Sequence, residues 1–297
     1  MKAFLNKHHK PALGIVLLLP AFITIVLTIL FPALWNFYLS FYSWDGFSEA
    51  TWNGMSNYQR ILNHRVTMLS FRNSVFIAVV VTVFATMMGM IFAFLVMRMK
   101  RREGAFYRLV LFTPVMLPMA VVGLLFSLLY NFEIGLFNSF LRLIGFDGLA
   151  RAWLAEPETV LGAISFTATW RMWGLTMMLV YTAIMAVPAD LFDACEIDGC
   201  GHFKRIYMII LPLIRPTIQT SVMLTLAFAF RSYDIVFIMT RGGPGTLSTI
   251  APLQMLTWGF QFNEFGTAAA VGTTFTFLVM AAVFVIQKLL RSDVYEY

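Results

Sequence analysis

Long stretches with almost no charged side chain alternate with short polar segments along the chain. Each stretch exceeds the roughly 20 residues that an α-helix needs to cross the hydrocarbon core of a bilayer. In lipid every backbone polar group must be bonded within its own segment, so the pattern predicts six membrane-crossing helices and an all-α, polytopic membrane fold. The six stretches lie between Lys10 and Asp45, between Arg72 and Arg98, between Arg108 and Glu133, from Thr159 to Ala189, from Arg215 to Thr240 and from Phe265 to Gln287.

The composition agrees with this interpretation. Hydrophobic residues make up 60% of the 297 residues, charged residues make up 12%, and the mean hydropathy is +0.78. A soluble domain usually carries about a quarter charged residues, so this chain could not cover a water-facing surface. The N-terminal apolar stretch is longer than the roughly 7–15 residues of a signal-peptide core, which favours an uncleaved first helix.

The positions of Lys and Arg predict the orientation, because these residues are kept on the cytoplasmic side of a membrane. With the N-terminus inside, the inner segments hold 13 Lys and Arg and the outer segments hold 6. The two that remain, Arg171 and Arg231, lie within spans. We therefore expect both termini to be cytoplasmic, and we interpret the net charge of +6 as a signal of topology rather than of nucleic-acid binding.

The sequence contains no pattern that indicates catalysis or a metal site. It lacks the phosphate-binding pattern G-x-x-x-x-G-K-[ST]. Cys195 and Cys200, with His202 nearby, offer fewer than the four ligands of a usual zinc site, and we interpret them as small packed residues in a reducing compartment. We expect no enzyme activity, no metal ion and no cofactor in this chain.

A polar segment separates the fourth and fifth predicted spans, on the predicted inner side. After Pro188, Asp190 is placed to cap a helix, and Gly199 and Gly201 permit a sharp turn. Apolar residues recur at helical spacing from Phe203 onward. The segment predicts a short helix, a turn and a second helix, which suit docking onto a soluble partner. A capped surface loop without a partner is the alternative.

The residues of this segment carry a resemblance to a known family. Asp193–Cys200 reads D-A-C-E-I-D-G-C, and Leu211-Pro212 follows it. This resembles the EAA loop of ABC importer permeases, E-A-A-x-x-D-G-A followed by L-P, with Asp for Glu and Cys for Ala. The resemblance implies that the loop fits a groove in an ATPase subunit. The residues implied in this coupling are Asp193, Ala194, Cys195, Asp198, Gly199, Cys200, Phe203, Leu211 and Pro212.

Three further segments extend the resemblance over most of the chain. Gly54–Leu62 (GMSNYQRIL) is similar to the G-L-x-N-Y motif before the second span of sugar permeases. Tyr107–Asn138 resembles the third-helix region, and Arg231–Ser248 (RSYDIVFIMTRGGPGTLS) resembles the end of the fifth helix. Together they place the chain closest to the carbohydrate branch of the type I ABC importers.

The resemblance implies a permease subunit of a bacterial plasma-membrane importer for a sugar or oligosaccharide. Its partners would be a second homologous permease, two ABC ATPase subunits that bind ATP and Mg, and an extracytoplasmic solute-binding protein, with no nucleic acid. We expect residues 1–69 to hold the tail, the first span and an outer loop. Residues 70–291 would form a permease core that includes the coupling loop 188–212, and residues 292–297 would form a tail.

Charged residues within spans are costly, and they are therefore candidates for the solute path. They are Arg171, Arg231 and Asp234, of which the last two are three residues apart and are expected to share a helix face. They would bind hydroxyl or acidic groups of the solute, beside aromatic rings that suit sugar faces. The alternatives are an ion pair that fixes helix packing and aromatic anchoring at the membrane interface. The candidate path residues are Ser232, Tyr233, Asp234, Arg231, Arg171, Trp170, Tyr130 and Asn131.

Other functions stay open at this point. The chain could be an ABC permease for a different solute, such as a phosphodiester or a polyamine. An ion-coupled secondary transporter would use carboxylates in the membrane, and Asp234 is the one acid within a predicted span. A non-transporting scaffold for an ATPase is a further possibility. The outer loop Thr240–Thr249 is either a receiving surface for the solute-binding protein, as the resemblance implies, or an ordinary exposed turn.

Overall fold

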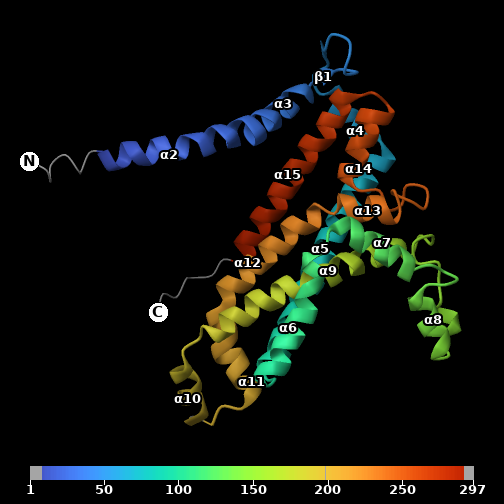
Figure 1. Cartoon of the computed structure of the whole chain (residues 1–297). Coiled ribbons are helices and arrows are strands. Elements are labelled where there is room, and N and C mark those ends of the chain that lie inside the picture. Colours follow the sequence, from blue (N-terminus) through green and yellow to red (C-terminus); the bar gives the residue numbers. More distant parts are fainter. Residues whose placement is uncertain (1–8, 198, 291–297) are drawn as a thin grey trace, which may run out of the picture. The chain divides into compact units, whose positions relative to one another are not determined.

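Helices make up nearly all of the structure. The computed structural model describes residues 9–197 and 199–290. Within them the sheet is a single antiparallel pairing of Tyr42 with Trp52 and of Ser43 with Thr51. The elements, with short 3-10 or π-helical turns labelled η, are α2 (His9–Ile25), η1 (Val26–Leu30), α3 (Phe31–Leu39), β1 (Tyr42–Ser43), β2 (Thr51–Trp52), α4 (Ser56–Asn63), α5 (Arg65–Met97), α6 (Arg101–Met116), α7 (Met119–Leu129), α8 (Leu136–Leu143), η2 (Asp147–Leu149), α9 (Val160–Met185), α10 (Ala189–Ile197), α11 (His202–Arg205), η3 (Ile206–Ile210), α12 (Leu211–Phe230), α13 (Tyr233–Met239), α14 (Ala251–Leu256), η4 (Thr257–Gln261) and α15 (Phe265–Leu290) (Figure 1).

The predicted all-α class is confirmed, whereas the count of six spans is not. Among the described residues four helices are long and apolar enough to cross a membrane, and the bent pair α6 and α7 can serve as a fifth. The remaining predicted span, the fourth along the chain, corresponds to α9, which is long enough but contains Arg171 and several buried hydroxyl side chains. Because those side chains lie against protein, α9 has the composition of a helix enclosed by other helices. The four helices are Leu17–Leu39, Arg65–Met97, Ile206–Phe230 and Phe265–Leu290.

The chain divides into two units, which are described separately. Unit 1 comprises the residues up to His64 together with Met255–Thr274. Unit 2 comprises Arg65–Gln254 and the residues from Phe275 onward. The predicted division near residue 69, which was drawn from the spans alone, stays a prediction.

Asn57 organises unit 1 and explains the N-Y motif in this part of the sequence. Its side chain is 3% exposed, and its amide nitrogen donates to the carbonyls of Ser40 at 2.9 Å and Tyr42 at 2.8 Å. Its amide oxygen accepts from the hydroxyl of Thr267 at 3.4 Å. A side chain at Gly266 would stand 1.8 Å from the carbonyl oxygen of Tyr42, so only glycine fits there. The asparagine thus joins the hairpin strand to the start of α15.

The loop between β1 and β2 closes around an exposed carboxylate. Asp45 accepts hydrogen bonds from the backbone amides of Ser48 at 2.8 Å and Phe47 at 2.9 Å. These bonds lower the pKa of Asp45 to about 2. The carboxylate therefore stays ionised in the folded loop until the pH falls to that value.

Helix α9 is the centre of unit 2 and packs on α5, α6 and α12. Two glycines allow the close approaches. A Cβ atom at Gly89 of α5 would lie 2.5 Å from Cβ of Thr176, and one at Gly174 of α9 would lie 2.1 Å from the carbonyl oxygen of Leu111 in α6. Small residues at such contacts let membrane helices gain van der Waals contact along their backbones. The positions of α5 and α6 are thus set by single residues that lack a side chain.

Two helices of unit 2 are interrupted. Between α6 and α7 the axis turns by 102° at Leu117-Pro118. Pro118 cannot donate a backbone hydrogen bond, and the amide of Leu117 bonds to the carbonyl of Pro114 at 3.2 Å instead. The second interruption lies at Arg231 and Ser232, between α12 and α13. Helices α7 and α13 pack on each other, so the short segments beyond both interruptions form one pair.

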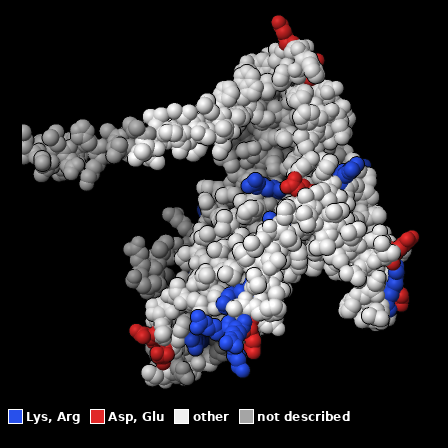
Figure 2. Space-filling model, in the orientation of Figure 1, with Lys and Arg blue, Asp and Glu red and all other residues white. Residues whose placement is uncertain are grey.

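The polar ends of unit 2 lie far apart (Figure 1). Helices α10 and α11 are at one end, and α7, α8 and α13 are at the other. Figure 2 shows Lys and Arg gathered at the first of these ends, where α6 begins. The exposed Arg98, Lys100, Arg101 and Arg102 belong to this region. The predicted inner loops therefore share one end of the unit, as the distribution of charge along the sequence required.

We predict that Gly174→Ala lowers the stability of the protein, because the added methyl group would overlap a backbone oxygen of α6. Overpacking of this kind costs about 1–3 kcal/mol. The measurement is the melting temperature of the purified protein, and Gly162→Ala on the same helix is the control, since a Cβ there meets no atom within 4 Å. Equal melting temperatures for the two variants would contradict the prediction.

Candidate coupling loop and transport path

The predicted helix, turn and second helix are present at residues 189–210. Helix α10 follows Pro188, and its end carries the features of a Schellman cap. Gly199 has a φ of +68°, and the amide of Cys200 donates to the carbonyl of Cys195 at 2.9 Å. No atom lies within 4 Å of a Cβ at Gly199, so the glycine is needed for its backbone angle rather than for space.

A cation–π contact joins the two sides of this turn. The guanidinium carbon of Arg205 in α11 lies 3.9 Å from the ring centre of Phe192 in α10. Phe192 also packs on a buried cluster that includes Ile184 and Ile210. A guanidinium over an aromatic face contributes about 0.5–2 kcal/mol, depending on how far it is removed from water. Arg205 and Phe192 therefore hold the hairpin on the end of the helix bundle.

The predicted coupling residues differ in exposure. Asp193 is exposed, Cys195 is buried with 4% exposure, and Cys200 is half-buried. Ile197 stands beside them with 87% exposure, a large apolar side chain at a polar end of the protein. Among the other candidates, Leu211 is half-buried, Pro212 is exposed, Asp198 lies outside the described residues, and so do the side chains of Ala194 and Phe203.

Arg171 lies at the corner between α6 and α7. Its Nε donates to the carbonyl oxygen of Leu117 at 3.1 Å, and an Nη donates to that of Val115 at 3.3 Å. Both carbonyls are at the C-terminal end of α6, where the helix leaves acceptors without intrahelical donors. A cation at a helix C-terminus is also favoured by the helix dipole. The structure thus gives Arg171 a bracing contact with backbone, and its predicted part in the solute path stays a prediction.

Arg231, Ser232, Tyr233 and Asp234 surround the interruption between α12 and α13. The spacing of Arg231 and Asp234 predicted that they share one helix face, and this prediction is wrong. Helix α12 ends at Phe230 and α13 begins at Tyr233, so the two residues do not lie on one continuous helix. Both are exposed, and the ion pairs of the described residues do not include them. Ser232 is buried and donates to the carbonyl of Ala229 at 2.5 Å. The break therefore presents two charged groups at the surface of unit 2.

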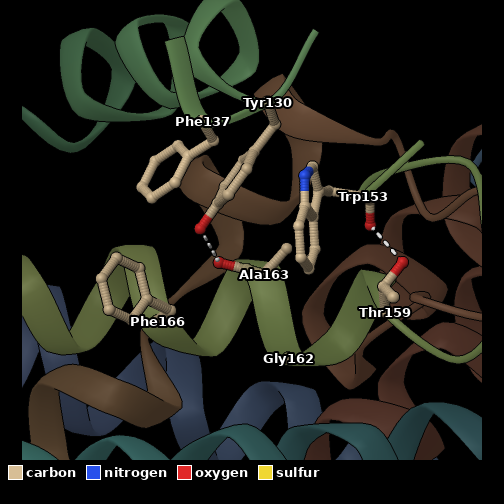
Figure 3. Close-up of a pocket in the computed structure, with 7 residues that line it drawn as sticks. All are labelled: Tyr130, Phe137, Trp153, Thr159, Gly162, Ala163 and Phe166. Atoms are coloured by element: carbon tan, nitrogen blue, oxygen red, sulfur yellow. Dashed lines mark hydrogen bonds between the residues drawn. The ribbon is translucent and has the colours of Figure 1, made fainter. Parts of the chain in front are cut away.

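The aromatic candidates lie elsewhere in unit 2. Tyr130 is buried, and its hydroxyl donates to the carbonyl of Ala163 at 3.2 Å (Figure 3). Trp170 packs on Phe126, with 5.1 Å between their ring centres. Asn131 is exposed, and its oxygen accepts from the backbone amide of Glu133 at 3.0 Å, which closes a turn. These contacts tie the three residues to the packing around α7.

The glycine-rich segment after α13 is a fixed turn. Gly242 has a φ of +90°, and its carbonyl accepts from the amide of Ser248 at 3.0 Å. Asn73 of α5 donates to the carbonyls of Leu247 at 2.7 Å and Thr249 at 2.9 Å. The turn is thus held against α5 by both N–H donors of one side-chain amide. Whether it receives a binding protein stays a prediction.

Arg205 and Phe192 are site residues that the sequence did not reveal. They are 13 positions apart and on opposite sides of a turn, so helical periodicity does not connect them. The carbonyl partners of Arg171 were missed for a related reason, since backbone acceptors have no residue type. A basic residue facing a proline-interrupted span is the one signal that could have suggested such a brace.

Comparison with known proteins gives a consistent result. Residues 85–294 match the family model described as "Binding-protein-dependent transport system inner membrane component". The "Probable ABC transporter permease protein YurN" of Bacillus subtilis (strain 168) is 32% identical over 89% of this chain and 91% of its own length. The "Trehalose/maltose transport system permease protein MalF" of Thermococcus litoralis is 28% identical over 96% of both chains.

The chain is also similar to a further permease and to a solved transporter structure. The "Sulfoquinovosyl glycerol transport system permease protein SmoG" of Agrobacterium fabrum is 28% identical over 94% of this chain and 91% of its own length. A chain of a bacterial ABC transporter that imports the acidic polysaccharide alginate has a TM-score of 0.82 at 18% identity. That likeness covers 97% of this chain and 98% of the other, and it shows a shared fold.

We predict that Arg171→Met destabilises the protein, because two carbonyls at the α6–α7 corner lose their donor within the helix bundle. A hydrogen bond that involves a charged group contributes about 1.5–3 kcal/mol. The measurement is the melting temperature of the purified protein. Arg171→Lys should lie between the wild type and the Met variant, since one ammonium group retains the charge but lacks the planar donor set.

Arg231→Gln is the matched control for this experiment, because Arg231 is also a basic residue next to an interruption but is exposed. We expect its melting temperature to stay close to that of the wild type. If Arg171→Met melts with the wild type, the bracing role is wrong.

Proposed function

Because the chain belongs to the family of binding-protein-dependent transport system inner membrane components, we propose that it is one permease subunit of an ATP-driven importer for a sugar or oligosaccharide. Membership makes it a multi-pass membrane subunit of an ABC transporter. Two of the relatives are named as permease proteins of trehalose/maltose and sulfoquinovosyl glycerol transport systems, which supports a carbohydrate solute. An ion-coupled carrier is not favoured by this kinship.

The observation that carries the proposal is the exposed hairpin of α10 and α11. It projects from the end of unit 2 opposite to α7 and α13, and it holds the residues that resemble the EAA loop (Figure 1). Asp193 supplies an exposed negative charge and Ile197 an exposed apolar side chain, which suit a groove with a basic rim and an apolar floor. We propose that this hairpin of the permease binds in a groove on the surface of the ATPase subunit.

The hairpin continues directly into a long helix. Segments α11, η3 and α12 follow one another without a gap from His202 to Phe230. At about 1.5 Å per residue this helix reaches on the order of 40 Å, enough to cross the bilayer. It ends at Arg231, beside the interruption that carries Ser232, Tyr233 and Asp234. A displacement of the hairpin is therefore delivered to the candidate solute path at the other end of the same helix.

The remaining parts of the transporter follow from this arrangement. Two separate ABC ATPase subunits would bind ATP and Mg, and their closure would move the hairpins. A second homologous permease would supply the other half of the path, and an extracytoplasmic binding protein would deliver the solute. The gathering of Lys and Arg at the hairpin end supports a cytoplasmic location for that end. The cytoplasmic location of both termini rests on the distribution of Lys and Arg along the sequence.

We predict that uptake by the assembled transporter requires ATP and the binding protein. The complex would be reconstituted in liposomes with ATP inside, and entry of a labelled oligosaccharide would be measured with the binding protein outside. Uptake should persist when a protonophore collapses the proton gradient. Uptake that proceeds without nucleotide, or that stops with the gradient, would contradict the proposal.

We also predict that Gly199→Val uncouples the hairpin from the ATPase. A β-branched residue at positive φ costs about 1–2 kcal/mol or more, so the turn would relax to another conformation. Both ATPase association and uptake should fall, whereas Gly199→Asn should retain most of each, because asparagine tolerates this backbone region. The measurements are co-purification of the ATPase and the uptake rate.

A second pair of variants tests the contact across the turn. Arg205→Gln should raise the number of ATP molecules hydrolysed per solute imported, because the hairpin loses its hold on Phe192. Lys204→Gln removes the neighbouring exposed charge and should leave this ratio unchanged. If Arg205→Gln hydrolyses as many ATP molecules per imported solute as the wild type, the contact with Phe192 has no part in coupling.

A further inference from the structure

A pocket opens in unit 2 between the end of α7, α8, the segment before α9 and the first turns of α9. Its volume is about 330 Å³, near the lower limit of small-molecule sites. Figure 3 shows that Tyr130, Phe137 and Trp153 face one another across it, with Phe166 of α9 on the same side as Phe137. Tyr130 and Phe137 are stacked, with 5.1 Å between their ring centres. The walls are therefore mainly aromatic.

The polar side chains of the pocket walls are already hydrogen-bonded within the protein. The Tyr130 hydroxyl donates to the Ala163 carbonyl at 3.2 Å, and the Trp153 indole donates to the side-chain oxygen of Asn138 at 2.8 Å. The Thr159 hydroxyl donates to the Trp153 carbonyl at 2.9 Å. A sugar in this space would lose its hydrogen bonds to water without replacing them. The pocket is suited to an apolar ligand and not to the transported solute.

Gly162 leaves the floor of the pocket empty. It lies in the first turn of α9, and a Cβ there would meet no atom within 4 Å. Neither a positive φ nor a close helix contact requires glycine at this position, in contrast to Gly174. A glycine within a helix costs about 0.5–1 kcal/mol relative to alanine. Glycine at this position therefore keeps the space above the helix open.

The sequence around the pocket changes from charged to apolar, as it does where a chain enters a membrane. The segment before α9 contains Arg151, Glu156 and Glu158, whereas Thr159–Trp170 has no charged residue. Tyrosine and tryptophan are typical of this boundary. Phe166 is 45% exposed on the surface of α9, so this side of the pocket is open to the exterior of unit 2.

Helix α8 presents a second apolar surface next to the pocket. Leu136, Phe140 and Leu143 recur at helical spacing and are 69%, 60% and 83% exposed. Phe137, the neighbour of Leu136 on the same helix, lines the pocket. A short helix with such an exposed apolar stripe fits the boundary between lipid headgroups and acyl chains. The acyl chains of the bilayer are therefore the apolar material that we expect beside the pocket.

We propose that this pocket binds one acyl chain of a membrane phospholipid. The chain would enter beside Phe166, lie over Gly162 and contact the rings of Tyr130, Phe137 and Trp153. It would fix α8 and the end of α7 at the membrane surface. The proposal requires the membrane location of the protein and is independent of the solute and of the ATPase.

The test uses the assembled transporter in lipid nanodiscs that contain a phosphatidylcholine with a photoactivatable diazirine in its acyl chain. After irradiation, mass spectrometry of peptides should find label on residues 130–137 and 153–166. Gly162→Leu should reduce this label by at least about tenfold, which corresponds to about 1.4 kcal/mol of binding free energy. Gly162→Ala should retain it, because one methyl group leaves most of the space open.

Label on lipid-facing helices elsewhere, such as α15, serves as the internal reference and should be equal in all three proteins. Absence of label from the pocket peptides of the wild type would overturn the proposal, whatever the variants do. The same label in Gly162→Leu would overturn it as well. Uptake by the same preparations is measured separately, so failure of the lipid site and failure of the importer function can be told apart.

Discussion

The structure depends on the rule that backbone acceptors within a membrane need donors. An unbroken helix satisfies the rule by itself, but an interrupted one does not. The turn of 102° between α6 and α7 frees carbonyls at Val115 and Leu117, and Arg171 of α9 supplies the donors for both. Gly174, one turn further along α9, brings this helix against the backbone of α6. The corner is therefore built by its neighbour as much as by Pro118, and the pairing of α7 with α13 follows from it.

Much of the fold could be predicted from the sequence, because charge-free length identifies membrane helices directly. The turn at Gly199 was also predictable, since a glycine pair between two amphipathic segments has few other uses. The corner at Leu117-Pro118 was not, because the stretch from Arg108 to Glu133 has the length and apolarity of one straight helix. Spacing misled at Arg231 and Asp234, since three residues place two side chains on one face only if the helix continues between them.

The candidate site was predicted in part for similar reasons. The hairpin residues stand together in the sequence, so their position in the structure follows from local geometry. Arg205 and Phe192 meet only after the chain has turned, and the acceptors of Arg171 are backbone oxygens that no residue type marks. Tyr130 was selected as a polar aromatic residue, but its hydroxyl is bonded to Ala163 and its ring faces an apolar pocket. Where a side chain points depends on tertiary contacts that periodicity does not contain.

The helix that joins the hairpin to the break at Arg231 is not uniform along its length. After the single turn of α11 it contains the π-helical turn η3, and Pro212 and Pro216 then remove two amide donors from the hydrogen-bonded ladder within the first turns of α12. Beyond Pro216 the hydrogen-bonded ladder contains no further proline as far as Phe230. Bending stiffness therefore increases from the hairpin toward the break. We therefore expect the hairpin end of this helix to bend more easily, and the end at Phe230 to move as a single body.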